Sequence, residues 1–302
     1  MKRLRSTAVL LTALWAAPWS AGAVSYSGAE PFSSLFLDAS ARAVGMGGAY
    51  TALANDAYAL AYNPAGLGRI NARQAAFMHN SHFEDITQEH VCFADPGGWG
   101  AAVNYLNFGE VSRTTVSNPG GTGLGKAGMT NMAAALGYGR VVGGPLSAGA
   151  AVKYVRETID DVRGSAFALD LGLLYSAERA SAGLAVQNLG PTVKFEGSKE
   201  SLPLNLRAGA AYGFPLLGRN CTAAADVVKE KNGKALFALG FELPLVKTVP
   251  VRLGFNTRNQ AGSGVSAGLG WKYGKFGFDY ALMSYGELGI THRLGLAYTW
   301  DK

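Results

Sequence analysis

The sequence has little of several things that soluble domains use. Charged residues make up only 16% of the 302 positions, against about 25% in an average soluble protein. Cysteine occurs twice and proline eleven times, and no apolar run is long enough for a membrane-spanning helix, which needs ~18 residues. Hydrophobic residues nevertheless account for 48% of the chain, which excludes a disordered protein. Scarce charge without a spanning helix favours a β-barrel that meets lipid directly.

Glycine is the residue that is present in excess. The chain contains 41 glycines, about twice the usual proportion. They follow no Gly-X-Y repeat, which excludes a collagen-like protein. Because glycine weakens the interior of a helix, we expect a fold that is not mainly helical.

The first 23 residues have the organisation of an export signal. Lys2, Arg3 and Arg5 form a basic start, residues 6–19 are apolar, and residues 21–23 are small, as at a cleavage site. Without these residues the chain carries 24 basic and 21 acidic side chains, a net charge of about +3. A nucleic-acid partner is therefore not expected.

From residue 73 onward the sequence alternates with a period of two. In residues 290–300, Leu294, Leu296 and Tyr298 alternate with small or polar residues such as Gly295 and Ala297. A solvent-exposed face would be rich in Lys and Glu, whereas the small face here is mostly Gly, Ala, Ser and Thr. We predict that the large face meets lipid and that the small face lines a crowded lumen.

Turn residues divide the alternating region into fourteen predicted strands of a length that suits a tilted membrane strand. Short connections alternate with longer ones at 109–126 and 189–203, so we expect short turns in the periplasm and longer loops outside the cell. The predicted strands are 73–82, 86–95, 98–108, 127–140, 146–157, 164–176, 180–189, 204–214, 220–229, 234–243, 250–258, 264–273, 275–284 and 289–300.

Aromatic residues gather at the strand ends beside the short turns. This placement predicts an interfacial girdle, although aromatic residues also favour strands in general. A sparser second girdle would comprise Tyr105, Tyr154, Phe167, Phe237 and Phe255. The main girdle would comprise Trp99, Tyr138, Tyr175, Tyr212, Trp271, Tyr273, Phe276, Tyr298 and Trp300.

Residues 24–72 do not alternate and contain a glycine cluster at 45–48. No strand precedes this cluster and no Lys-Ser/Thr pair follows it, so a phosphate-binding loop is excluded. We predict a hatch, or plug, over 24–72 that packs inside a barrel over 73–302, with short helix within 50–60 that ends before Pro64. The hatch motif consists of Arg42, Gly45, Met46, Gly47, Gly48, Asn63, Pro64, Ala65 and Gly66.

This motif resembles the amino-terminal hatch of the FadL/TodX outer-membrane transporters and, more closely, that of the PorV/PorQ family. The likeness continues at 188–191, 206–212 and 268–280 and covers nearly all of the chain after the export signal. The resemblance implies a fourteen-stranded barrel with the hatch folded inside. FadL relatives admit hydrophobic compounds, whereas PorV carries secreted proteins in type IX secretion. The end of the last strand resembles the signal read by the barrel-assembly machinery through Arg293, Gly295, Tyr298 and Trp300.

The small face also carries charged residues, which would be enclosed by the barrel. Enclosed charges are costly unless they are paired or hydrated. They could line a polar permeation path, or they could form ion pairs that tether the hatch, and we favour the second interpretation. These residues are Lys153, Asp170, Arg207, Asp226, Glu242, Arg252, Lys272, Asp279 and Arg293.

The sequence offers little for catalysis or metal binding. His79 and His82 would lie on opposite faces of a strand, so a shared metal is not expected. Adjacent residues such as His79, Asn80 and Ser81 do not face one another as a catalytic triad requires. Cys92 and Cys221 fall in separate strands, and we expect no disulfide. We therefore predict neither an enzyme nor a bound cofactor.

The function predicted from the sequence is passive passage of small hydrophobic solutes, such as fatty acids, across the bacterial outer membrane. The alternative is a non-conducting carrier or scaffold in a type IX-like secretion system. The expected partners are outer-membrane lipid, the barrel-assembly machinery, and hydrophobic small molecules or secreted proteins.

Overall fold

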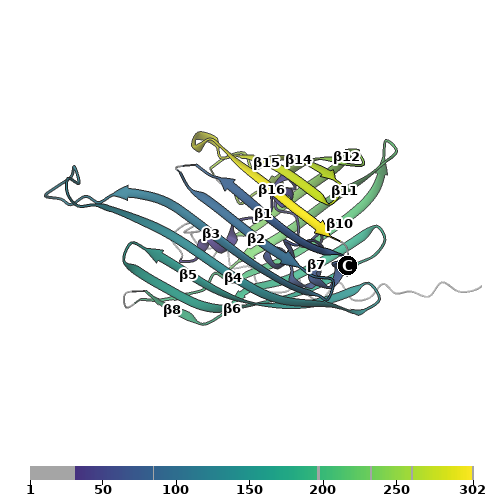
Figure 1. Ribbon diagram of the computed structural model, residues 1–302, viewed down its shortest axis with the longest axis horizontal. Coiled ribbons are helices and arrows are strands. Elements are labelled where there is room, and N and C mark those ends of the chain that lie inside the picture. The colour runs from purple at the N-terminus through teal and green to yellow at the C-terminus, as the bar shows by residue number, and fades with distance from the viewer. Residues whose placement is uncertain (1–30, 84, 196–197, 232, 260, 301–302) are drawn as a thin grey trace, which may run out of the picture.

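A computed structural model describes residues 31–83, 85–195, 198–231, 233–259 and 261–300, and the predicted export signal lies outside these ranges. Within them, fourteen antiparallel strands follow one another round a closed barrel (Figure 1). The ring closes where the first strand, β1 (Arg73–Ser81), pairs with the last, β16 (Ile290–Trp300). The predicted fourteen-stranded barrel is confirmed.

The observed strands agree closely with those predicted from the alternation. Two further short strands, β8 (Thr192–Phe195) and β9 (Ser198–Ser201), pair with each other in the connection between β7 and β10. The remaining barrel strands are β2 (Thr87–Ala94), β3 (Trp99–Ser112), β4 (Lys126–Gly143), β5 (Leu146–Ile159), β6 (Val162–Ser176), β7 (Ala180–Leu189), β10 (Asn205–Leu216), β11 (Arg219–Glu230), β12 (Ala235–Val246), β13 (Val249–Asn256), β14 (Val265–Tyr273) and β15 (Phe276–Ser284).

The wall is apolar outside and small or polar inside. On β16, Leu294 and Leu296 are about half exposed, whereas Thr291 and Arg293 on the opposite face are buried. This is the reverse of a soluble barrel, in which large apolar side chains point inward. The outward face therefore suits contact with lipid.

The two ends of the barrel differ. The short connections lie at one end, together with the start of β1 and the end of β16, and we call it the short-turn end; the marked C-terminus shows it in Figure 1. The other end, the long-loop end, carries the hairpin of β3 and β4. The barrel wall is taller around β4, which has 18 residues, than around β13, which has 8.

Aromatic side chains encircle the barrel at the short-turn end, where the sequence predicts the main girdle. Trp99 and Tyr138 pack with ring centroids 4.9 Å apart, and Phe276 and Tyr298 pack at 5.0 Å. These four side chains are 36–55% exposed on the outside of the wall. Such amphipathic rings are typical of the membrane interface.

Ahead of β1, the chain forms short helical turns that lie within the barrel outline in Figure 1. We call the described residues 31–72 the inner segment. The prediction of a short helix within 50–60 is wrong for most of that range, since the only helix there begins at Ala59 among the described residues. The N–H groups of Tyr50 and Thr51 donate to a carboxylate on a strand and not to a helix carbonyl. The helical turns are η1 (Ser33–Phe36), α1 (Ala41–Gly45), α2 (Ala59–Tyr62) and η2 (Pro64–Arg69), with η3 (Gly286–Leu288) before β16.

None of the helices in the described ranges is long and apolar enough to span a membrane.

Candidate functional site: the inner segment and the barrel wall

Glycines on the inner wall make room for the inner segment. On nine strands of the described chain, a Cβ added to an inward glycine would lie within 3.1 Å of an atom of this segment. Real Cβ atoms seldom approach so closely, so a side chain at any of these positions would collide with the backbone or the side chains of the segment. We call these residues the glycine belt: Gly100, Gly137, Gly139, Gly149, Gly172, Gly183, Gly209, Gly240, Gly254 and Gly268.

The Asn63-Pro64 part of the predicted motif contacts the belt on β5, β6 and β7. Asn63 is buried, and its amide donates to the carbonyl oxygens of Thr51 at 3.1 Å and Leu173 at 3.0 Å. Its side-chain oxygen accepts from the N–H of Ala65, which caps η2 and allows Pro64 to occupy the first helical turn. This side chain therefore joins two parts of the inner segment to the wall.

The glycine part of the motif contacts the opposite strands. A Cβ on Gly254 would lie 2.0 Å from the nitrogen of Gly47, and one on Gly268 would lie 3.1 Å from the Cα of Gly45. Gly47 has φ +66, a conformation that favours glycine. This cluster is thus a close backbone contact with β13 and β14.

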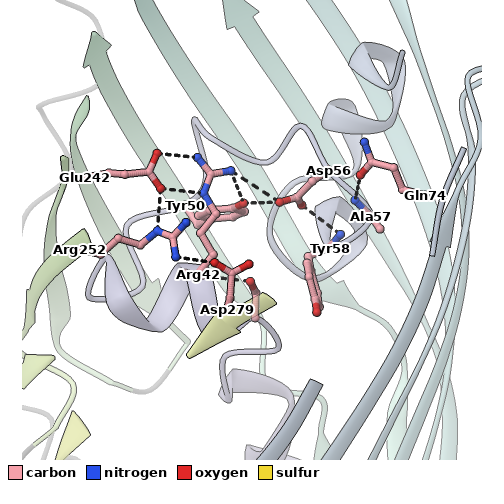
Figure 2. Close-up of polar contacts among 11 residues, drawn as sticks. Arg42, Tyr50, Asp56, Ala57, Tyr58, Gln74, Glu242, Arg252 and Asp279 are labelled. Atoms are coloured by element: carbon pink, nitrogen blue, oxygen red, sulfur yellow. Dashed lines mark hydrogen bonds and ion pairs between the residues drawn. The ribbon is translucent and has the colours of Figure 1, made fainter. Parts of the chain in front are cut away.

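A charged network joins α1 to three strands (Figure 2). The Arg42 guanidinium donates to both oxygens of Glu242 on β12, at 3.1 and 3.2 Å. Arg252 on β13 donates to Glu242 at 2.7 Å and to Asp279 on β15 at 2.5 Å. Two arginines thus share two carboxylates, and Arg252 is only 2% exposed. Such bidentate, charge-assisted bonds fix orientation as well as adding energy.

The same network continues within the inner segment. Arg42 also donates to the Tyr50 hydroxyl at 3.1 Å, and that hydroxyl donates to the Asp56 carboxylate. Burial raises the pKa of Asp56, and the neighbouring Arg42 guanidinium opposes this shift. The N–H of Ala57 donates to Gln74 on β1 at 3.1 Å, so the network also reaches the first strand.

A second cluster holds the turn after the glycine motif. The Asp226 carboxylate on β11 accepts from the N–H groups of Tyr50 and Thr51 and from the Thr51 hydroxyl, at 2.5–3.1 Å. Arg207 on β10 donates to Asp226 at 3.2 Å and to the carbonyl oxygen of Gly48 at 3.0 Å. Both charged side chains are nearly fully buried. The inner segment is therefore bonded to both strands of one hairpin.

A third cluster lies in the wall where the pairing of β6 and β7 shifts register between Leu169 and Leu171. Lys153 and Asp170 form an ion pair at 2.6 Å, and Asp170 accepts from the backbone N–H of Asn188 at 2.8 Å. Asn188 takes a left-handed conformation there, with φ +63. This cluster stabilises an irregular part of the wall and does not contact the predicted motif.

Two of the nine predicted enclosed charges have no ion pair in the described part of the chain. Lys272 is on the inward side of β14 but is exposed at the short-turn end. Arg293 is 2% exposed and donates to the Thr291 hydroxyl at 3.0 Å.

Burial, together with the charge of Arg293, lowers the pKa of His82 to about 4, so His82 is neutral near pH 7.

His79, His82 and the two cysteines take ordinary structural positions. His79 bonds to Glu89 at 2.7 Å on the partly exposed wall, and His82 packs against Phe83. Cys92 and Cys221 are free and buried, on β2 and β11. Among the described residues, no group of three or more His, Cys, Asp or Glu side chains could hold a metal ion.

Several residues that hold the inner segment were not among those predicted. Tyr50, Thr51, Asp56 and Gln74 all take part in the networks described above. Glu157 on β5 accepts from the N–H of Phe32 at 2.8 Å near the start of the described chain. In the alternating sequence, Glu157 and Gln74 stand at positions whose side chains point into the barrel. This alternation could have identified them as candidates for contact with the inner segment.

A cavity of about 50 Å³ lies between the inner segment and the wall formed by β2 to β5. Leu35, Leu37 and Leu60 line it from the segment, and His90, Asn104 and Lys153 are among the wall residues that line it. Its volume is large enough for a few water molecules.

The chain matches two protein families. Residues 11–166 match the family described as "Uncharacterised protein family (UPF0164)", and residues 145–298 match "Type IX secretion system membrane protein PorP/SprF". A UPF0164 protein from Treponema pallidum (strain Nichols) is 29% identical over 178 residues, which cover 53% of this chain. The match covers 44% of that relative, so it spans less than half of the relative's length.

Solved structures with a similar fold are outer-membrane transporters and channels. The toluene transporter TbuX of Ralstonia pickettii has a TM-score of 0.59 at 15% identity, over 86% of this chain and 97% of that one. The CymD monoaromatic hydrocarbon channel has a TM-score of 0.60 at 12% identity, with the same coverage. The toluene transporter TodX of Pseudomonas putida has a TM-score of 0.55 at 12% identity, over 85% and 95% of the two chains. At these identities the likeness shows a shared fold.

The general resemblance seen in the sequence is thus supported, while PorV/PorQ membership stays a prediction. Each family match covers slightly more than half of the 302 residues, and the two together extend from within the predicted export signal to the last strand. The protein belongs to the UPF0164 family and, through its carboxy-terminal half, to the PorP/SprF family of type IX secretion system membrane proteins.

Proposed function

We propose that the protein is an outer-membrane barrel closed by its inner segment, and that it serves as a carrier or scaffold in protein secretion. The observation that carries this proposal is the set of contacts that hold the inner segment against the barrel wall. A part-buried ion pair joins its Arg42 to Glu242 on β12, and hydrogen bonds to Asp226 and Arg207 join it to β11 and β10. Close contacts with the glycine belt join it to β4–β7. The segment acts as a plug, and membership of the PorP/SprF family supports the role in secretion.

The energy of these contacts favours a closed state. Removing one partner from a buried ion pair typically costs 3–5 kcal/mol, because the other charge is left unpaired. A plug that left the wall would have to break the Arg42–Glu242 ion pair and, on the adjacent strand, the hydrogen bonds that Tyr50 and Thr51 donate to Asp226. The fraction of open barrels at equilibrium would then be very small.

We expect the wild-type protein, reconstituted in a planar lipid bilayer, to show no stable ionic conductance. The double variant Arg252→Gln/Asp279→Asn should show openings, because it weakens the network around Glu242 and Arg42. Cleavage at Arg42 by trypsin should rise in parallel, as measured by mass spectrometry. The matched control is Arg73→Gln/Asp95→Asn, which removes an exposed pair at 3.0 Å on the outer wall and should change neither readout.

Conductance that rose without any change in cleavage would contradict the plug. The network would then line a permeation path and would not tether the segment.

The role in secretion needs a test in the source bacterium. Deleting the gene should reduce the amount of secreted proteins in the culture supernatant while leaving uptake of labelled fatty acid or toluene unchanged. Re-expression of the wild-type gene should restore secretion. Loss of uptake with normal secretion would overturn the scaffold proposal.

The second candidate function is passage of small hydrophobic solutes. The fold shared with TbuX, CymD and TodX favours it, as does the partly apolar cavity beside Leu35 and Leu60. At about 50 Å³ this cavity is smaller than typical ligand pockets of ~300 Å³ or more. Passage would therefore require the inner segment to move, and the deletion experiment above separates the two functions.

A further inference from the structure

The short-turn end of the barrel carries an excess of exposed positive charge. The hairpins β4–β5, β6–β7, β10–β11, β12–β13 and β14–β15 each have at least one exposed basic residue at this end. In the described chain the exposed ends and turns there carry two acidic residues, Asp95 and Glu178, and Asp95 is bonded to Arg73 at 3.0 Å. We call the following residues the cationic ring: Arg140, Arg179, Arg219, Lys247 and Lys272.

The long-loop end does not share this excess. Around the β3–β4 hairpin and the β5–β6 turn, Arg113 forms ion pairs with Asp160 and Asp161, and Lys126 pairs with Glu110 at 3.4 Å. Charges of both signs are therefore mixed in this region, and several of them are paired. The asymmetry between the two ends is a property of the fold and not of the overall composition.

The cationic ring lies just beyond the aromatic girdle. Arg140 is two residues after Tyr138, and both are exposed on the same outward face of β4. Lys272 stands between the outward residues Trp271 and Tyr273 at the end of β14; its own parity is inward, but at the rim its side chain is exposed. Because tryptophan and tyrosine mark the depth of the interface, these cations lie at the depth of the lipid headgroups.

The geometry points to anionic phospholipid: we propose that the cationic ring binds the phosphate-bearing headgroups of the leaflet at the short-turn end. The ring follows the circumference, with at least one cation on each of five successive hairpins. An annulus of lipid would contact all of these positions at once, whereas a folded acidic protein would contact one sector. Each Lys or Arg close to an anionic surface contributes a factor of about five to binding.

The position of the tryptophans allows a direct test. The three tryptophans beyond the predicted export signal, Trp99, Trp271 and Trp300, all lie at the short-turn end. The full-length mature protein is reconstituted in phosphatidylcholine vesicles that contain either brominated phosphatidylglycerol or brominated phosphatidylcholine at equal mole fraction. Bromine quenches tryptophan fluorescence on contact, so the ratio of quenching gives the relative affinity for the two headgroups.

We expect phosphatidylglycerol to be preferred at least threefold at low salt, and the preference to fall towards one in 1 M NaCl, where the Debye length is ~3 Å. The variant Arg140→Gln/Arg179→Gln/Lys247→Gln should lose most of the preference. The matched control Arg163→Gln/Lys231→Gln/Lys234→Gln removes three exposed cations at the long-loop end and should retain it.

Equal quenching by the two lipids in the wild-type protein would overturn the proposal, and this measurement does not depend on any variant folding. A preference that the cationic-ring variant keeps in full would also overturn it, provided that heat-modifiable migration shows the variant to be folded. In that case the headgroup selectivity would arise elsewhere on the wall.

Discussion

Replacing Asp226 with alanine is expected to release the inner segment from β10 and β11. The substitution removes the acceptor for the N–H groups of Tyr50 and Thr51 and for the Thr51 hydroxyl, and it leaves Arg207 buried without its counter-charge. We expect a loss of about 3–5 kcal/mol in the docking free energy of the segment. Limited trypsin digestion of the vesicle-embedded protein measures this as faster cleavage at Arg42.

Two further variants separate the charge of Asp226 from its geometry. Asp226→Asn keeps one acceptor oxygen and should give an intermediate effect. The double variant Asp226→Leu/Arg207→Met removes both charges, and replacing a buried pair by apolar residues of similar size is often neutral. If the double variant were as sensitive to trypsin as Asp226→Ala, the unpaired arginine would not be the cause of the loss.

Enlarging a single glycine of the belt is expected to expel part of the inner segment while leaving the barrel intact. In Gly149→Val, the new Cβ would start 2.4 Å from the carbonyl group of Pro64, which is backbone and cannot rotate away. Overpacking of this kind typically costs 1–3 kcal/mol or more, whereas valine itself favours strands. The barrel should still show heat-modifiable migration, and bilayer recordings should show openings that the wild-type protein lacks.

The matched control for this substitution is Gly143→Val. Gly143 is the last residue of β4, and a Cβ added there would meet no atom within 4 Å. This control should behave as the wild-type protein does. Conductance in both variants would mean that barrel disturbance, and not displacement of the inner segment, causes the openings.

The strands could be predicted from the sequence because their signal is local. Alternation fixes which side chains share a face, and lipid on one side makes that pattern unusually clear, as between Leu294 and Gly295. The inner segment has no such period. Its shape depends on bonds to residues far along the chain, such as Asp226 to Tyr50, and no local pattern specifies them.

The same distinction applies to the candidate site. The inward parity of Arg252 and Asp279 could be predicted, and so could the need for enclosed charges to be paired. The identity of each partner could not, because strand register, tilt and the path of the inner segment decide it together. Arg293 illustrates the limit, since its position predicts an ion pair but the described chain places no carboxylate beside it.

The contacts of the inner segment with late strands have a consequence for the order of assembly. Val44 accepts a hydrogen bond from Ser266, and Phe36 accepts one from Arg258, each across 222 positions of the sequence. Contacts of such long range form slowly, because a large loop must close before they can be made. The inner segment therefore cannot complete its docking until β14 has been synthesised and exported. Its last contacts span about as much of the sequence as the pairing of β1 with β16, so docking of the segment and closure of the barrel belong to the same late stage of assembly.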